Sequence, residues 1–187
     1  MLREGCNALV RVATIEDLVR VVPPPGDPVG ARGGWREVES ELGLGLPADF
    51  RALVECYGLG QFLDFITPLT PFGPVNLLFD RARRLLEGER SFRDSHPDKC
   101  PYPFYPEPGG LLEWAGSDNG DRLCWLTEGE PGEWTTVVWN PRGWYYDAHE
   151  MSAVSFLLGW MVGDVSTSIF ADVREPVPWF TPHRPRC

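Results

Sequence analysis

The sequence predicts an α+β fold, an antiparallel β-sheet meander packed against N-terminal and C-terminal helices. Helical periodicity recurs through residues 14–88 and returns after Ser152. Between these parts, residues 111–147 contain short β-rich segments separated by turn residues, the pattern of consecutive antiparallel strands. A chain of 187 residues is long enough to bury one substantial core.

The first predicted element is a short amphipathic helix at the N-terminus. Thr14 and Asp17 have the spacing of a capping box, and apolar residues follow at helical spacing as far as Val22. Three consecutive prolines then stop the helix, and residues 23–34 are rich in Pro and Gly, as expected for a loop or link.

Two helices joined by a Leu-Pro corner are predicted over residues 35–60, WREVESELGLGLPADFRALVECYGLG. Pro47 suits a first helical position, and Asp49 lies in the first turn, near the positive end of the helix dipole. Gly58 provides a C-terminal cap. The apolar residues form one stripe on each helix: Trp35, Val38 and Leu42, then Phe50, Leu53, Val54 and Tyr57.

The next stretch is predicted to be less regular. Residues 62–66 form a short strand, and prolines 68, 71 and 74 exclude a central strand beyond it. A helix is expected from Pro74 to about Gly88. Residues 91–110 are rich in Pro, Tyr, Ser and Asp and are predicted to be a long surface excursion.

The predicted meander begins with a hairpin around Asn119-Gly120, a dipeptide that favours tight turns between strands. The β-branched and aromatic run 134–139 is the clearest strand, and the turn at 140–143 leads into the strand 144–147. Ser152 then caps a helix that is apolar nearly all round, as expected of a buried helix. The boundaries predicted are an N-terminal helix and link (1–34), an α+β domain (35–170) and a Pro-rich tail (171–187).

The motif over residues 35–60, with its order Trp, Glu, Leu, Leu-Pro, Asp-Phe, Leu, Tyr-Gly-x-Gly, resembles the N-terminal signature of the SUKH superfamily. Residues 116–125 and 133–138 resemble the family's central strands, and the helix after Ser152 resembles its closing helix. The resemblance implies a SUKH-like fold. It also implies a role as a yeast-type cell-wall regulator or as a bacterial immunity protein that neutralises a toxin.

Composition narrows the function classes. The net charge of −10 argues against nucleic-acid binding. No apolar run approaches the roughly 20 residues that cross a bilayer, and the N-terminus lacks a signal-peptide pattern. The five scattered cysteines and the three separated histidines form no metal-ligand spacing. We therefore expect a cytoplasmic protein with reduced cysteines, no cofactor and no metal; its oligomeric state stays open.

Most of the negative charge lies in one window. Residues 107–150 hold nine acids and two bases, a net charge of −7. General solubility explains such a window as well as a docking surface for a basic partner does. On the docking hypothesis, acids of the β-region supply charge and tryptophans supply buried area. The predicted partner-binding residues are Glu113, Trp114, Asp118, Asp121, Trp125, Glu128, Glu130 and Glu133.

Catalysis has one candidate, the carboxylate pair Asp118 and Asp121 near Glu113. Neighbouring carboxylates serve as general acid and base in hydrolases. The simpler interpretation is a β-turn in which Asp and Asn bond their own backbone, and we favour it.

The sequence therefore predicts a protein-binding module that is not an enzyme, most specifically an immunity protein for a polymorphic toxin, possibly a nuclease. The alternatives are an intracellular regulatory or scaffold protein and, less favoured, a hydrolase that uses Asp118 and Asp121.

Overall fold

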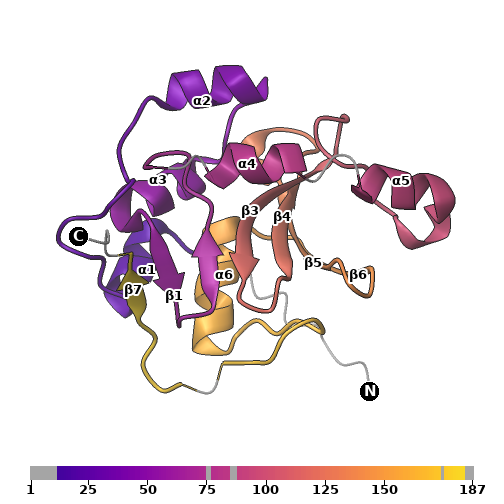
Figure 1. Ribbon diagram of the computed structural model, residues 1–187. Coiled ribbons are helices and arrows are strands. Elements are labelled where there is room, and N and C mark those ends of the chain that lie inside the picture. The colour runs from indigo at the N-terminus through magenta and orange to yellow at the C-terminus, as the bar shows by residue number, and fades with distance from the viewer. Residues whose placement is uncertain (1–11, 75–76, 85–87, 174, 184–187) are drawn as a thin grey trace, which may run out of the picture.

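A computed structural model describes residues 12–74, 77–84, 88–173 and 175–183. Most helices lie before residue 100, and the sheet is formed mainly by residues 111–149 (Figure 1). The elements are α1 Ile15–Val21, α2 Trp35–Leu42, α3 Ala48–Tyr57, β1 Gly60–Phe62, β2 Ile66–Pro68, α4 Leu77–Arg84, α5 Gly88–Ser95, η1 Pro97–Lys99, β3 Leu111–Ser117, β4 Arg122–Leu126, η2 Pro131–Glu133, β5 Thr135–Asn140, β6 Tyr145–His149, α6 Ala153–Val162 and β7 Phe180–Pro182.

All strands in the described residues join one antiparallel sheet of seven strands in the order β6-β5-β4-β3-β2-β1-β7. The meander predicted over residues 111–147 forms one half of this sheet, from the edge strand β6 to β3 in the middle. A bulge between Glu113 and Ala115 interrupts the register of β3 and β4. The chain has the α+β fold that the sequence predicts.

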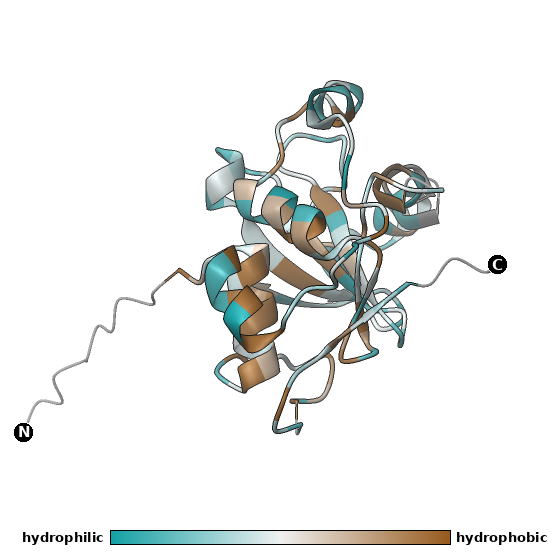
Figure 2. Ribbon diagram, turned by 90° about the vertical axis from the view of Figure 1, so that its left-hand side faces the viewer, coloured by the Kyte–Doolittle hydropathy of each residue, from teal (hydrophilic) through white to brown (hydrophobic). Residues whose placement is uncertain are grey.

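One face of the sheet packs on α1, α3 and α6. Phe50 of α3 meets Trp125 of β4 edge to face, with ring centroids 4.8 Å apart. Figure 2 looks at the sheet from its β7 side and shows these helices on one side of the strands and α4 on the other. The strands contribute eight fully buried apolar residues to this core: Phe62, Ile66, Leu112, Trp114, Ala115, Leu123, Trp125 and Val138.

The opposite face of the sheet is also covered, which corrects the prediction of a surface excursion over residues 91–110. Phe92 of α5 stacks on Trp144, with ring centroids 3.8 Å apart, and Phe104 packs on Trp139 at 5.3 Å. Arg93 donates two hydrogen bonds to the Glu107 carboxylate and ties the segment to itself. The resulting second core consists of Phe104, Leu111, Cys124, Val137 and Trp139.

Two boundaries differ from the sequence prediction. Gly88 begins α5 where a helix end was predicted; Val75 and residues 85–87 of the predicted helix lie outside the described residues. Residues 62–66 form the turn of a hairpin between β1 and β2, and Pro68 ends β2, which lies inside the sheet. Proline fits there because it is the last residue of the strand, and the next bond to β3 is made by the Leu69 N–H, which donates to the Trp114 carbonyl at 2.8 Å.

Both terminal segments contribute to the domain. Leu18 and Val22 are fully buried in the main core, although α1 belongs to the segment predicted to precede the domain. In the predicted tail, Phe180–Pro182 form the edge strand β7, and Phe180 packs on Tyr57 and Phe62. The outermost parts, residues 1–11 and 184–187, lie outside the described residues.

Asp49, just after the Leu-Pro corner, connects α3 to α6, a helix that is distant in sequence. Asp49 Oδ1 accepts a hydrogen bond from the Phe50 N–H at 2.9 Å, and its Oδ2 accepts one from the Val154 N–H at 3.1 Å. Val154 lies in the first turn of α6, where backbone N–H groups have no partner within the helix. Asp49 therefore caps α6 from α3 and fixes how these helices meet.

We predict that Asp49→Ala lowers the free energy of unfolding by about 1–2 kcal/mol, the usual cost of removing a helix cap. Urea unfolding of the full chain measures the change. Asp27→Ala is the matched control, since Asp27 is exposed and its replacement is expected to stay within about 0.5 kcal/mol. Equal effects of the two substitutions would contradict the capping role.

Candidate functional site

The structure separates the predicted partner-binding residues into buried and exposed groups. Trp114 and Trp125 have no exposed surface and lie in the main core, so a partner cannot reach them. Their assignment to an interface is wrong, because the sheet is covered on both faces. Glu113 and Asp121 are also buried, at 0% and 1% exposure. Asp118, Glu128, Glu130 and Glu133 are exposed.

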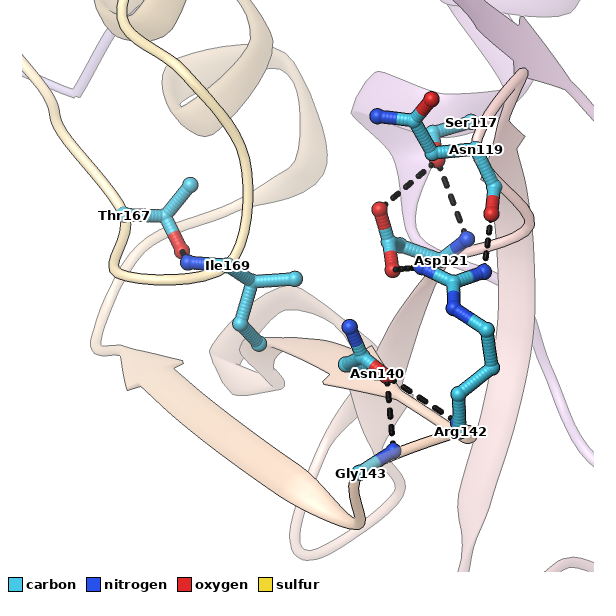
Figure 3. A network of polar contacts seen from close by, with 8 residues as sticks. All are labelled: Ser117, Asn119, Asp121, Asn140, Arg142, Gly143, Thr167 and Ile169. Carbon is cyan, nitrogen blue, oxygen red and sulfur yellow. Dashed lines mark hydrogen bonds and ion pairs between the residues drawn. The ribbon is translucent and has the colours of Figure 1, made fainter.

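Asp121 is held inside the turn between β3 and β4 (Figure 3). Its carboxylate accepts hydrogen bonds from the Ser117 hydroxyl at 3.1 Å and from Arg142 Nη2 at 2.8 Å. Arg142 also donates to the Asn119 carbonyl, while the Asn140 side chain accepts the Arg142 and Gly143 N–H groups. The network connects the two hairpin turns of the meander at one end of the sheet.

Asp118 is directed to different partners. Its Oδ1 accepts a hydrogen bond from the Gln61 amide at 2.8 Å, and its N–H donates to the Phe65 carbonyl. The two carboxylates suggested as a catalytic pair are thus held by separate residues, Asp118 by Gln61 and Asp121 by Arg142. The predicted β-turn is present, because the Gly120 N–H donates to the Ser117 carbonyl at 2.9 Å. The two carboxylates, however, bond other side chains, whereas the sequence analysis favoured bonds to their own backbone.

Glu113 lies on the face of the sheet that α4 and α5 cover. Arg122 and Arg81 approach its carboxylate at 3.7 and 3.9 Å, distances too long for hydrogen bonds, and Arg122 also pairs with Glu89 at 3.1 Å. Burial raises the pKa of Glu113 to about 7; the two arginines oppose this shift and Glu89 adds to it. Burial dominates because the ion pairs are long.

The exposed acids concentrate where β4 passes into β5. Glu128, Glu130 and Glu133 surround the short helix η2, and Glu150 joins them because Thr136 at the start of β5 pairs with His149. We call these four residues the acidic end. Within the described chain none of the four forms an ion pair. The sequence-based site residues omitted Glu150, although it lay in the same acidic window.

The loop that carries the acidic end is anchored to the domain. The buried Trp134 donates its indole N–H to the Gly129 carbonyl at 3.2 Å, and the Glu133 N–H donates to the Glu130 carbonyl at 2.8 Å. Gly129 has a positive φ of 77°, which glycine adopts without strain. The carboxylates therefore project from a defined loop.

The predicted acidic surface is divided. Asp118 lies in the turn before β4, whereas Glu128, Glu130 and Glu133 follow its other end. A strand of five residues separates these ends by about 17 Å, because each residue advances about 3.3 Å. Asp118 therefore does not belong to the acidic end.

The described residues contain neither a metal-binding cluster nor a membrane-spanning helix. Among the described residues, no group of three or more His, Cys, Asp or Glu side chains is arranged to hold a metal ion. No helix in the described part of the chain combines the length and apolar character that a membrane span requires.

One known protein family matches most of the chain. A family model described as SUKH_6, SMI1-KNR4 cell-wall, matches residues 33–157. The chain belongs to this SUKH family. The match runs from the residues just before α2 into α6 and includes the acidic end. No curated protein and no solved structure matches the chain.

We predict that Arg142→Ala lowers the free energy of unfolding by about 1–3 kcal/mol, because it leaves the buried Asp121 carboxylate without its cation. In chemical denaturation, Asp121→Asn should recover part of this loss in the Arg142→Ala background. Arg20→Ala removes an exposed ion pair with Asp17 and is the control, with an expected effect of about 0–1 kcal/mol. Additive effects of the Arg142 and Asp121 substitutions would show that the contact contributes nothing.

A second prediction concerns the pH dependence of stability. Because the pKa of Glu113 is raised to about 7 by folding, the folded chain binds a proton that the unfolded chain releases above about pH 4.5. Between pH 5 and pH 8 the parent should therefore lose about 2–3 kcal/mol of stability relative to Glu113→Gln. Urea unfolding of both proteins across this range measures the difference, and parallel profiles would refute the raised pKa.

Proposed function

We propose that this SUKH domain is a binding protein without catalytic activity, and that it acts as an immunity protein for a polymorphic bacterial toxin. The observation that supports the proposal best is the acidic end, four exposed carboxylates on an anchored part of the surface with no described cation beside them. Family membership supports the module type. The partner expected for this surface is a toxin domain with a basic face.

The physical role of the acidic end is to attract and orient that partner. Complementary charges at an interface raise the association rate and reject partners of the same sign. A nuclease toxin suits this surface because its substrate-binding cleft must be basic to hold phosphates. Covering such a cleft would neutralise the toxin without any chemistry by the immunity protein.

A regulatory role is the second candidate. The description of the matching family refers to SMI1-KNR4 and the cell wall, which favours a module that binds a resident cellular protein. Both functions use a protein-binding surface, and they differ in the partner. A toxin encoded beside this chain, and protection of cells by the chain against it, would distinguish immunity from regulation.

We predict that the double substitution Glu130→Lys and Glu133→Lys slows association with the toxin domain encoded next to this chain by about tenfold or more at low salt. Stopped-flow mixing measures the rate, and the deficit should shrink as salt screens the charges. Asp164→Lys is the control, because Asp164 is an exposed acid beyond the far end of α6.

Co-expression gives the functional result. The parent and the Asp164→Lys protein should protect cells from the toxin, and the doubly reversed protein should protect less at a matched expression level. Full protection by the doubly reversed protein would exclude the acidic end as the docking surface. Absence of binding by the parent would exclude the immunity function for that toxin.

A further inference from the structure

A groove lies at the opposite edge of the sheet from β6, on the face that carries Glu113. Along β1, β2 and β7 the side chains of Phe62, Ile66 and Phe180 point into the main core. Alternation along a strand directs their neighbours to the other face. The groove has a volume of about 710 Å³, within the range of about 300–1,000 Å³ typical of ligand sites.

The groove combines apolar walls with a polar floor. The walls are Leu59, Pro74, Leu77 and Pro182, while the floor is formed by Gln61, Thr67 and Thr181 from the three strands. Neither threonine hydroxyl bonds to another described residue, so both remain available to hydrogen-bond a ligand. Walls of this kind accept apolar side chains, and a floor of this kind accepts the polar groups of a peptide backbone.

The wall on the β7 side is firmly held. Phe180 packs against Tyr57 and Phe62 with ring centroids 5.1 and 4.8 Å apart. The His183 N–H donates to the Leu59 carbonyl at 2.8 Å, and the Trp179 indole donates to Asp64 at 3.3 Å. The groove is therefore formed before any ligand binds, which lowers the entropic cost of binding. Strand β7 lies outside the residues 33–157 that the family match covers, so the match does not describe this wall.

Negative charge marks one end of the groove. The floor residue Gln61 donates its amide to the exposed Asp118, and Asp64 lies in the adjacent β1–β2 turn. Neither carboxylate forms an ion pair within the described residues, and the nearby Arg142 is bound to Asp121. A cationic group at this end would therefore gain two carboxylates that have only neutral partners.

We propose that the groove binds an extended peptide segment of a partner protein, with apolar side chains between the walls and a lysine or arginine beside Asp118. Three to four extended residues match the length of the three-residue strands, since an extended residue spans about 3.3 Å. The site is separate from the acidic end and does not depend on the partner being a toxin.

Random peptides displayed on phage and selected on the immobilised full chain test the proposal. Phage that also bind the Leu77→Glu variant are removed during the selection. This substitution places a charge in the apolar wall. The recovered peptides should contain apolar residues and a lysine or arginine. Their affinity should fall by more than about tenfold with Leu77→Glu and with Thr181→Arg, because the arginine side chain fills the floor. With Asp118→Asn their affinity should fall by about threefold to fivefold. Asp164→Asn removes an exposed acid that belongs to neither surface, so it is the control and should change nothing.

Several results would overturn the proposal. One is that no peptide survives the selection. Another is that the surviving peptides bind Thr181→Arg as tightly as the parent, and a third is that they contain no lysine or arginine. Tighter peptide binding by a chain ending at His183 would show that its own last residues occupy the groove. A dimer that Leu77→Glu dissociates in sedimentation would assign the groove to a second copy. Thermal unfolding of each variant separates these outcomes from misfolding, and Thr181 is exposed enough to tolerate substitution.

Discussion

Burial of the central sheet on both faces is the constraint on which the rest of the structure depends. Strands β3, β4 and β5 send Trp114 and Trp125 to one core and Trp139 to the other. A sheet covered in this way cannot offer its face to a partner, so recognition is left to loops, edges and ends. The same burial encloses Glu113 beside Arg122, and desolvation disfavours the Glu113 charge more than its long ion pairs favour it.

Local sequence patterns predicted the elements well where a single residue type controls the geometry. The Thr14–Asp17 capping box and the Ser152 cap are present, and the Asn-Gly turn joins β3 to β4. The sequence could not predict the second core, because period-two alternation does not reveal whether the outer face is wet or covered. Gly88 was predicted to end a helix, but it begins α5, because glycine occurs at both ends of helices. Strand β7 follows a Pro-rich stretch, and its pairing depends on Phe180 reaching Tyr57.

Charge along the sequence does not translate directly into charge on a surface. A window of nine acids appeared to form one patch, but successive hairpin turns lie at opposite ends of a meander. Asp118 and Glu128 are therefore separated by the length of β4, while Glu150 is brought to Glu133 by pairing between β5 and β6. Two further acids of the window, Glu113 and Asp121, are used internally. The predicted tryptophans Trp114 and Trp125 are buried in the main core, which the helices cover, so their burial could not be predicted from charge or composition along the chain.

The family signature itself serves the fold. Trp35 donates its indole N–H to Glu55 at 2.7 Å, Glu39 accepts the Leu46 N–H at 2.9 Å, and Asp49 caps α6. These polar groups are engaged within the domain and position the Leu-Pro corner against the sheet. A match based on such residues therefore identifies the scaffold and carries no information about the partner. Partner choice therefore depends on residues that this scaffold leaves exposed, and the η2 loop and the groove completed by β7 are the two such surfaces that we propose for binding.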